Sequence, residues 1–115
     1  MILLNDYQQL FADWQTLNFK ADKSTLVHMA LGACEEAGEF AHWVLKYDQG
    51  IRGVDLDKAK AEAADAFGDT VVYMMQGLHK LGVTPEEALL TCFDRVLKRN
   101  WKTNPEGIGE TQHKE

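Results

Sequence analysis

Three glutamates lie within five residues at Glu35, Glu36 and Glu39, in a segment whose periodicity predicts a helix. At about 100° of rotation per residue, their side chains fall within roughly a quarter turn of one another. Glu36 lies within the apolar stripe of that helix, where an unpaired carboxylate is either costly or protonated. A bound cation would offset both the free-energy cost of burying the Glu36 charge and the repulsion among the three carboxylates. We therefore predict that these three glutamates are catalytic residues and bind metal.

A second acidic cluster lies downstream, where Glu62, Asp65 and Asp69 follow an i, i+3, i+7 spacing along one face of another predicted helix. Alanines and glycines, among them Gly38 and Gly68, separate the acids in both clusters and favour close packing of the two helices. The six carboxylates predict an all-oxygen site suited to Mg²⁺, with Mn²⁺ as an alternative, rather than to zinc.

Hydrophobic periodicity predicts the elements that carry these acids. The expected helices span residues 5–19, 24–47, 57–81 and 85–101, and no alternating strand pattern occurs. Asp22 or Ser24 is the expected cap of the second helix, and Asp55 or Asp57 of the third. The segment beginning Thr84-Pro85 is a strong helix start. We expect an all-α domain of four helices over residues 1–102, followed by a polar, flexible tail over 103–115.

The third predicted helix is apolar around most of its circumference beyond Asp69, with Phe67, Val71 and Met74 on one side and Val72 and Tyr73 nearer the acids. A helix that is apolar all round is buried all round. One small domain has few fully central helices, so a second subunit is the expected cover. We predict a homodimer or homotetramer with the acidic cleft near a subunit interface.

Composition limits the remaining classes of function. The 115 residues have room for one domain, and the formal net charge of −6 argues against a nucleic-acid partner. No stretch approaches the length of a membrane span, so we expect no membrane partner. Cys34 and Cys92 lie in apolar helical segments without a dense disulfide pattern. We therefore expect both to be reduced core residues of a cytoplasmic protein.

The two acidic motifs together resemble those of the MazG-like, all-α nucleoside triphosphate pyrophosphohydrolases. The likeness covers about residues 25–101, with Glu35-Glu36-x-x-Glu39 as an EExxE motif and Gly68-Asp69-x-Val71-Val72-Tyr73 downstream. It implies an enzyme that uses Mg²⁺ to hydrolyse a (d)NTP to the monophosphate and pyrophosphate, acting on phosphoric anhydride bonds. A role in clearing unwanted nucleotides would follow from the same resemblance.

The register of the second family motif, ExxD, has two solutions. Alignment on Gly68-Asp69 puts Ala66 where a glutamate is expected, whereas Glu62 and Asp65 fit the spacing one turn earlier. Asp65 could also supply the carboxylate from the same face as Asp69. The metal ligands that we predict are Glu36, Glu39, Asp65 and Asp69, with Glu35 and Glu62 second. An outer glutamate would be the general base.

The remaining candidates are residues that would contact the substrate. A triphosphate carries about four negative charges, so cationic side chains are expected around it. Arg52 is the strongest of these because it lies in a glycine-rich loop. The predicted substrate-binding residues are Lys46, Arg52, Lys98, Arg99, Asn100 and Trp101. Trp14 and Trp43, at helical spacing, are instead expected in the core.

Two other classes of protein fit parts of the sequence. Glu39 and His42 form an ExxH pair of the kind found in di-iron carboxylate bundles, although a second pair would have to come from a symmetric partner. A non-catalytic helical oligomer would instead pair its acids with lysines such as Lys58 and Lys60. In that case Glu36 should have a basic partner and no metal.

Overall fold

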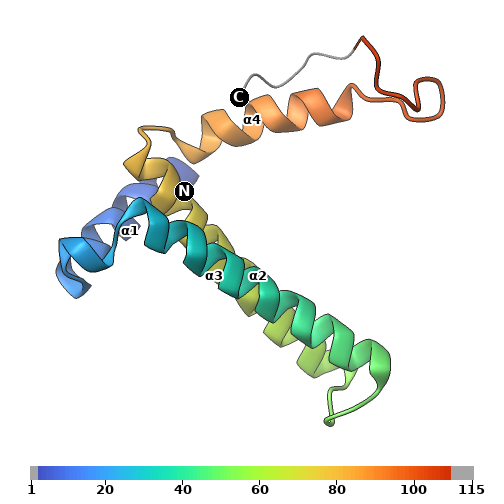
Figure 1. The fold of residues 1–115 in the computed structure, drawn as a ribbon, viewed down its shortest axis with the longest axis horizontal. Coiled ribbons are helices and arrows are strands. Elements are labelled where there is room, and N and C mark those ends of the chain that lie inside the picture. The colour runs from blue at the N-terminus through green and yellow to red at the C-terminus, as the bar shows by residue number, and fades with distance from the viewer. Residues whose placement is uncertain (1–2, 110–115) are drawn as a thin grey trace.

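The computed structural model describes residues 3–109, which contain four α-helices, one short 3₁₀ helix and no strand (Figure 1). The elements are α1 (Leu4–Asn18), η1 (Ala21–Lys23), α2 (Leu26–Gln49), α3 (Leu56–Lys80) and α4 (Pro85–Leu97). The predicted all-α fold with four helices is confirmed. The fourth helix ends at Leu97, earlier than expected, and turns follow it to residue 109. The last part of the predicted tail, 110–115, lies outside the described residues.

Local side-chain chemistry accounts for the helix starts. Asp55 caps α3 by accepting a hydrogen bond from Lys58 N at 2.9 Å, as predicted. Thr84 and Glu87 form the expected capping box at α4, with Pro85 in the first turn. The cap of α2 is Thr25, so the prediction of Asp22 or Ser24 is wrong. The hydroxyl of Ser24 donates to Lys20 O at 3.2 Å and is buried.

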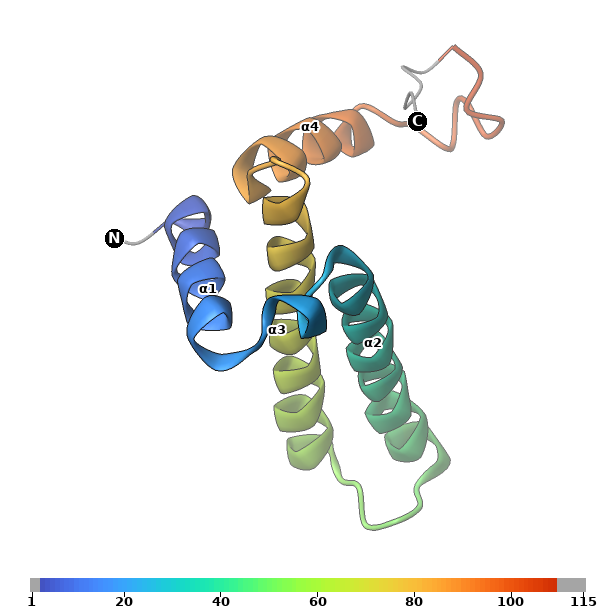
Figure 2. The ribbon, with the colours of Figure 1, turned by 60° about the vertical axis from the view of Figure 1, so that its left-hand side comes forward.

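The helices α2 and α3 pack side by side as a hairpin, and α1 packs against the C-terminal half of α3 (Figure 2). Buried contacts join these elements, because Gln8 Nε2 donates to the carbonyls of Met75 at 2.9 Å and Val83 at 3.0 Å. The helix α4 extends away from the hairpin (Figure 1). Its first turn is held to α1 where Asn5 Oδ1 accepts from Glu86 N at 3.1 Å.

Glycine permits one close contact between α2 and α3, but not at the predicted positions. A Cβ at Gly32 would collide with the ring of Tyr73, whereas one at Gly38 or Gly68 would meet nothing within 4 Å. The small residues that pack closely within this chain are instead alanines, with Ala33 and Ala66 both buried. Gly32 therefore lets the Tyr73 ring lie against the backbone of α2.

We expect Gly32→Ala to destabilise the protein by about 1–3 kcal/mol, because the new methyl group must displace the Tyr73 ring. The matched variant Gly38→Ala should instead gain up to about 1 kcal/mol, since it adds helix propensity in open space. Chemical unfolding of the two variants beside wild type measures both changes. Equal effects of the two substitutions would show that Tyr73 has no bearing on the position.

The chain leaves much apolar surface uncovered. The radius of gyration is 17.5 Å, against about 13 Å for a compact chain of this length. Phe67 on α3 is 64% exposed and Leu97 on α4 is 84% exposed. The buried apolar residues are few, namely Met29, Ala33, Val54, Ala59, Ala66 and Met75. The helix α3, which the sequence predicts to be buried on all sides, is thus covered on only part of its circumference within one chain.

Two further expectations concern burial and membranes. Both cysteines are free thiols, but Cys34 is exposed and Cys92 half-buried, so the prediction that both lie in the core is wrong within this chain. None of the helices in residues 3–109 combines the length and apolarity needed to cross a bilayer.

Candidate functional site

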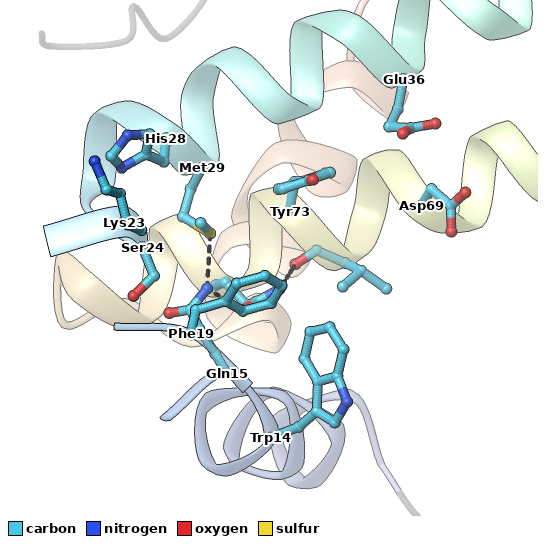
Figure 3. A pocket seen from close by; sticks show the side chains of 12 residues that line it. Trp14, Gln15, Phe19, Lys23, Ser24, His28, Met29, Glu36, Asp69 and Tyr73 are labelled. Atoms are coloured by element: carbon cyan, nitrogen blue, oxygen red, sulfur yellow. Dashed lines mark hydrogen bonds between the residues drawn. The ribbon is translucent and has the colours of Figure 1, made fainter. Parts of the chain in front are cut away.

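A cavity of about 470 Å³ lies where α1, η1, α2 and α3 meet (Figure 3). Figure 3 shows Glu36 and Asp69 at one end, and Lys23, Ser24 and His28 at the other. Aromatic and amide side chains line the space between these ends: Trp14, Gln15, Phe19, Tyr73 and Gln76. The volume falls in the range of small-molecule sites. The cavity therefore has an acidic end, an opposite end with Lys23, Ser24 and His28, and an aromatic and amide wall between them.

Glu36 on α2 and Asp69 on α3 both line the cavity, so the structure brings together one member of each predicted acidic cluster. Partial burial raises the pKa of Glu36 above its ordinary value, and the negative charge of Asp69 is the next largest cause. The charges of Glu35, Glu39 and Asp65 raise it further. All four neighbours are predicted site residues. Excess negative charge on this scale favours a cation.

The other predicted ligands surround this pair without converging on it. Glu35, Glu39 and Asp65 are exposed, and Glu62 is half-buried. Among residues 3–109, no three side chains of the Asp, Glu, His or Cys type stand close enough together to hold a metal ion. The arrangement is thus a facing pair of carboxylates with further acids nearby, rather than a closed cage of ligands.

The raised pKa of Glu36 should make the stability of the metal-free protein depend on pH. The folded protein holds this proton more tightly than the unfolded chain does, so Glu36 contributes stability that is complete below 4.5, its ordinary pKa. That contribution is lost as the pH rises through the raised folded value. Relative to Glu36→Gln, the free energy of unfolding of wild type should fall as the pH rises above 4.5 in EDTA. A difference that does not change with pH would contradict this expectation.

The predicted substrate-binding residues do not line the cavity of this chain. Arg52 lies in the loop after α2 with a left-handed φ of 58°, and the helix from Glu36 to that loop spans about 20 Å. Lys46 Nζ donates to Gln49 Oε1 at 3.3 Å. The charged side chain that lines the cavity opposite the carboxylates is Lys23, which the sequence did not single out.

Four more of these candidates follow α4, away from the hairpin (Figure 1). Lys98 pairs with Asp94 at 2.8 Å, and the Arg99 guanidinium lies 5.8 Å from the centre of the Trp101 ring. Asn100 Oδ1 accepts from two backbone N–H groups, those of residues 102 and 103. These contacts stabilise the turn after α4 and leave the segment remote from the carboxylate pair of its own chain.

Several lining residues escaped the sequence analysis. Trp14 was expected in the core, but it is 47% exposed and forms a wall of the cavity, with the Phe19 ring in edge contact at 5.7 Å. Gln15 and Gln76 are buried and reach each other across the cavity wall. The signal that could have found Gln15 is the one that found Glu36, a polar side chain within an apolar helical stripe.

The two rival classes receive little support from contacts around the acids. No lysine or arginine forms an ion pair with Glu36 within residues 3–109, whereas the non-catalytic oligomer requires one. Lys58 lies 5.4 Å from the centre of the Trp43 ring instead. The ring of His42 makes an edge contact with the Trp43 ring at 5.0 Å, so the ExxH histidine packs beside an aromatic residue.

Comparisons of the chain with models of known families, with curated proteins and with solved structures found no match. The geometry defines a class of site, a cavity with two carboxylates at one end and aromatic and amide groups along its wall. Such a site suits a ligand that has an anionic, metal-binding end and a flat, polar-edged end.

Proposed function

We propose that the protein is a Mg²⁺-dependent nucleoside triphosphate pyrophosphohydrolase that converts a (d)NTP to (d)NMP and pyrophosphate. The observation that carries the proposal is the cavity in which Glu36 and Asp69 occupy one end and Trp14, Phe19 and the buried glutamines line the wall beyond them. Phosphates would lie at the carboxylate end, bridged by metal, and the base would lie among the aromatic rings. The resemblance of the acidic motifs to MazG-like enzymes supports the same assignment.

Two carboxylates are enough for the metal chemistry proposed. Mg²⁺ keeps several waters and is commonly bound by one or two carboxylates together with substrate phosphates. Glu36 and Asp69 are the two that line the cavity, and they fit this mode of binding. Glu39, Asp65, Glu35 or Glu62 would then contact metal-bound water or a second ion. Mn²⁺ would be accepted by the same oxygen ligands.

The reaction needs little from the protein beyond position and charge. A water oxygen would attack the α-phosphorus while the bond to the bridging oxygen breaks and pyrophosphate leaves. Attack at the α position follows from the motif resemblance. A Mg²⁺ ion held by Glu36 and Asp69 would offset the negative charge on the leaving group, and one glutamate would accept the proton lost by the water. Glu35 and Glu39, which are exposed beside Glu36, are the candidates for this base.

The decisive test is to incubate the protein with a panel of ribo- and deoxyribonucleoside triphosphates and to identify the products by phosphorus NMR. Monophosphate and pyrophosphate that form with Mg²⁺ and disappear with EDTA would support the proposal. Diphosphate and orthophosphate would indicate attack at the terminal phosphorus and contradict it. No turnover together with stoichiometric iron would favour the di-iron bundle.

We also propose that the active form is a homo-oligomer, built on at least a homodimer. Beside the functional cavity, α2 and α3 form an apolar groove of about 470 Å³ lined by residues such as Ala30, Cys34, Met74 and Leu78. A second copy is the proposed occupant, because one chain leaves α3 and α4 widely exposed and too little apolar area is buried to stabilise the hairpin alone.

Sedimentation equilibrium should therefore give at least twice the monomer mass of 13.0 kDa. Met74→Glu, which adds a charge to the groove, should shift the protein toward monomer. Leu17→Glu is a matched control because Leu17 is exposed on α1 outside the groove. A stable monomer in the wild type would overturn the oligomer, and equal dissociation by both variants would exclude this groove as its interface.

A further inference from the structure

Two buried glutamines, Gln15 on α1 and Gln76 on α3, line the functional cavity. Figure 3 shows Gln15 on the side away from Glu36 and Asp69. Gln15 is 7% exposed, so its amide needs partners within the protein. The side chains of Gln15 and Gln76 are hydrogen-bonded to each other. A buried amide pair beside a cavity can either hold helices together or recognise a ligand.

The orientation of both amides is set from one end by a backbone carbonyl. Gln76 Nε2 donates to Val72 O at 3.3 Å, and a carbonyl can only accept. The amide of Gln76 therefore turns Oε1 toward Gln15, and Gln15 Nε2 donates a hydrogen bond to it. The same nitrogen lies 3.1 Å from Met29 Sδ, another acceptor. Each contact requires nitrogen at this position, so Oε1 of Gln15 must face the opposite way.

The oxygen of Gln15 keeps its capacity to accept a hydrogen bond. No donor within residues 3–109 forms a hydrogen bond with it. In the same range, Arg95 Nε is the one fully buried side-chain nitrogen or oxygen without a hydrogen-bond partner. The oxygen of Gln15 is therefore not fully buried. Gln15 lines the cavity, so a ligand held there could donate a hydrogen bond to this oxygen. Trp14 and Phe19 supply flat surfaces beside it.

We propose that Gln15 is a specificity-determining residue whose Oε1 accepts a hydrogen bond from an exocyclic amine of the nucleobase. The inference rests on the proposed function and deepens it. The favoured substrates are then nucleotides whose base has an exocyclic amine, such as cytosine or adenine. A uracil or hypoxanthine base would present a carbonyl oxygen to the oxygen of Gln15, leaving two acceptors unpaired in a partly buried place.

The test uses base pairs that differ at this exocyclic group. We would measure kcat/KM for CTP against UTP and for ATP against ITP, and the Kd of CMP, UMP, AMP and IMP by calorimetry. The amino member of each pair should be favoured by about tenfold or more, as expected for one hydrogen bond to a buried acceptor. In Gln15→Met, which removes the acceptor but keeps an unbranched side chain, both ratios should fall to within about twofold of one.

Two further variants separate recognition from structure. Gln8→Met is a matched control, because Gln8 is also buried on α1 and bonded to the α3 side, yet does not line the cavity. It should lower stability while leaving the amino-to-keto ratios unchanged. Gln76→Met removes the anchor that orients Gln15, so its amide can rotate and offer Nε2 to a carbonyl. The ratios should then fall even though Gln15 is present.

The outcomes distinguish the two proposals. Equal binding of the amino and keto monophosphates, or ratios that Gln15→Met leaves intact, overturns the role of Gln15 even if triphosphates are hydrolysed. Amino-selective binding that depends on Gln15, without any triphosphate hydrolysis, overturns the proposed reaction and supports the nucleobase site. A loss of selectivity in Gln8→Met equal to that in Gln15→Met would reduce both residues to a structural role and overturn the inference.

Discussion

Glu36→Gln is expected to lower Mg²⁺-dependent hydrolysis by about 10²- to 10³-fold or more, while the metal-free protein stays folded. The size follows from the loss of a preorganised group that stabilises charge at the reacting centre. Glutamine keeps the shape of the side chain but removes the ionisable carboxyl group of Glu36, whose pKa is raised by burial and by Asp69. Without that charge, no desolvation penalty remains in the absence of metal, so stability at neutral pH should be equal or higher.

Initial rates at saturating Mg²⁺ and thermal unfolding in EDTA test this expectation together. Asp48→Asn is a suitable control, because Asp48 is exposed on α2 and is not among the charges that raise the pKa of Glu36. It should retain wild-type turnover. Wild-type activity in Glu36→Gln would mean that the reaction, if present, takes place elsewhere. Loss of folding together with loss of activity would instead indicate a structural carboxylate.

The sequence predicted the features that depend on local rules. Thr84, Pro85 and Glu87 begin a helix because cap chemistry is contained within one turn. Glu36 was identified for a similar reason, since a carboxylate in an apolar stripe is costly wherever that stripe packs. The pairing of Glu36 with Asp69 followed from two acidic faces on adjacent helices, and the structure places both residues in one cavity.

Features that depend on how distant segments meet escaped the sequence. Gly38 and Gly68 lie among the acids, so we expected them to permit close helix packing. The contact that leaves no room for a Cβ is instead at Gly32, against the ring of Tyr73. Trp14 has the spacing of a core residue, yet it is 47% exposed and lines a cavity between α1, α2 and α3. Periodicity gives the face of a helix but not what covers that face.

Asp69→Asn should reduce hydrolysis by about 10²-fold or more, and Asp65→Asn by about tenfold or less, which would settle the register of the second acidic motif. Asp69 lines the cavity opposite Glu36, whereas Asp65, one turn earlier on α3, does not line it and acts on Glu36 through its charge. Removal of a metal ligand costs more than removal of a group that orients a ligand or its water.

Mg²⁺ titration of the rate separates these roles. Asp69→Asn should raise the Mg²⁺ concentration needed for half-maximal rate, because a direct ligand is lost. Asp65→Asn should lower kcat with a smaller change in that concentration. Comparable losses in both variants would indicate one site shared by adjacent turns of α3. A larger loss in Asp65→Asn would favour the Glu62-Asp65 register, and side-chain rotation would then have to bring those two acids to Glu36.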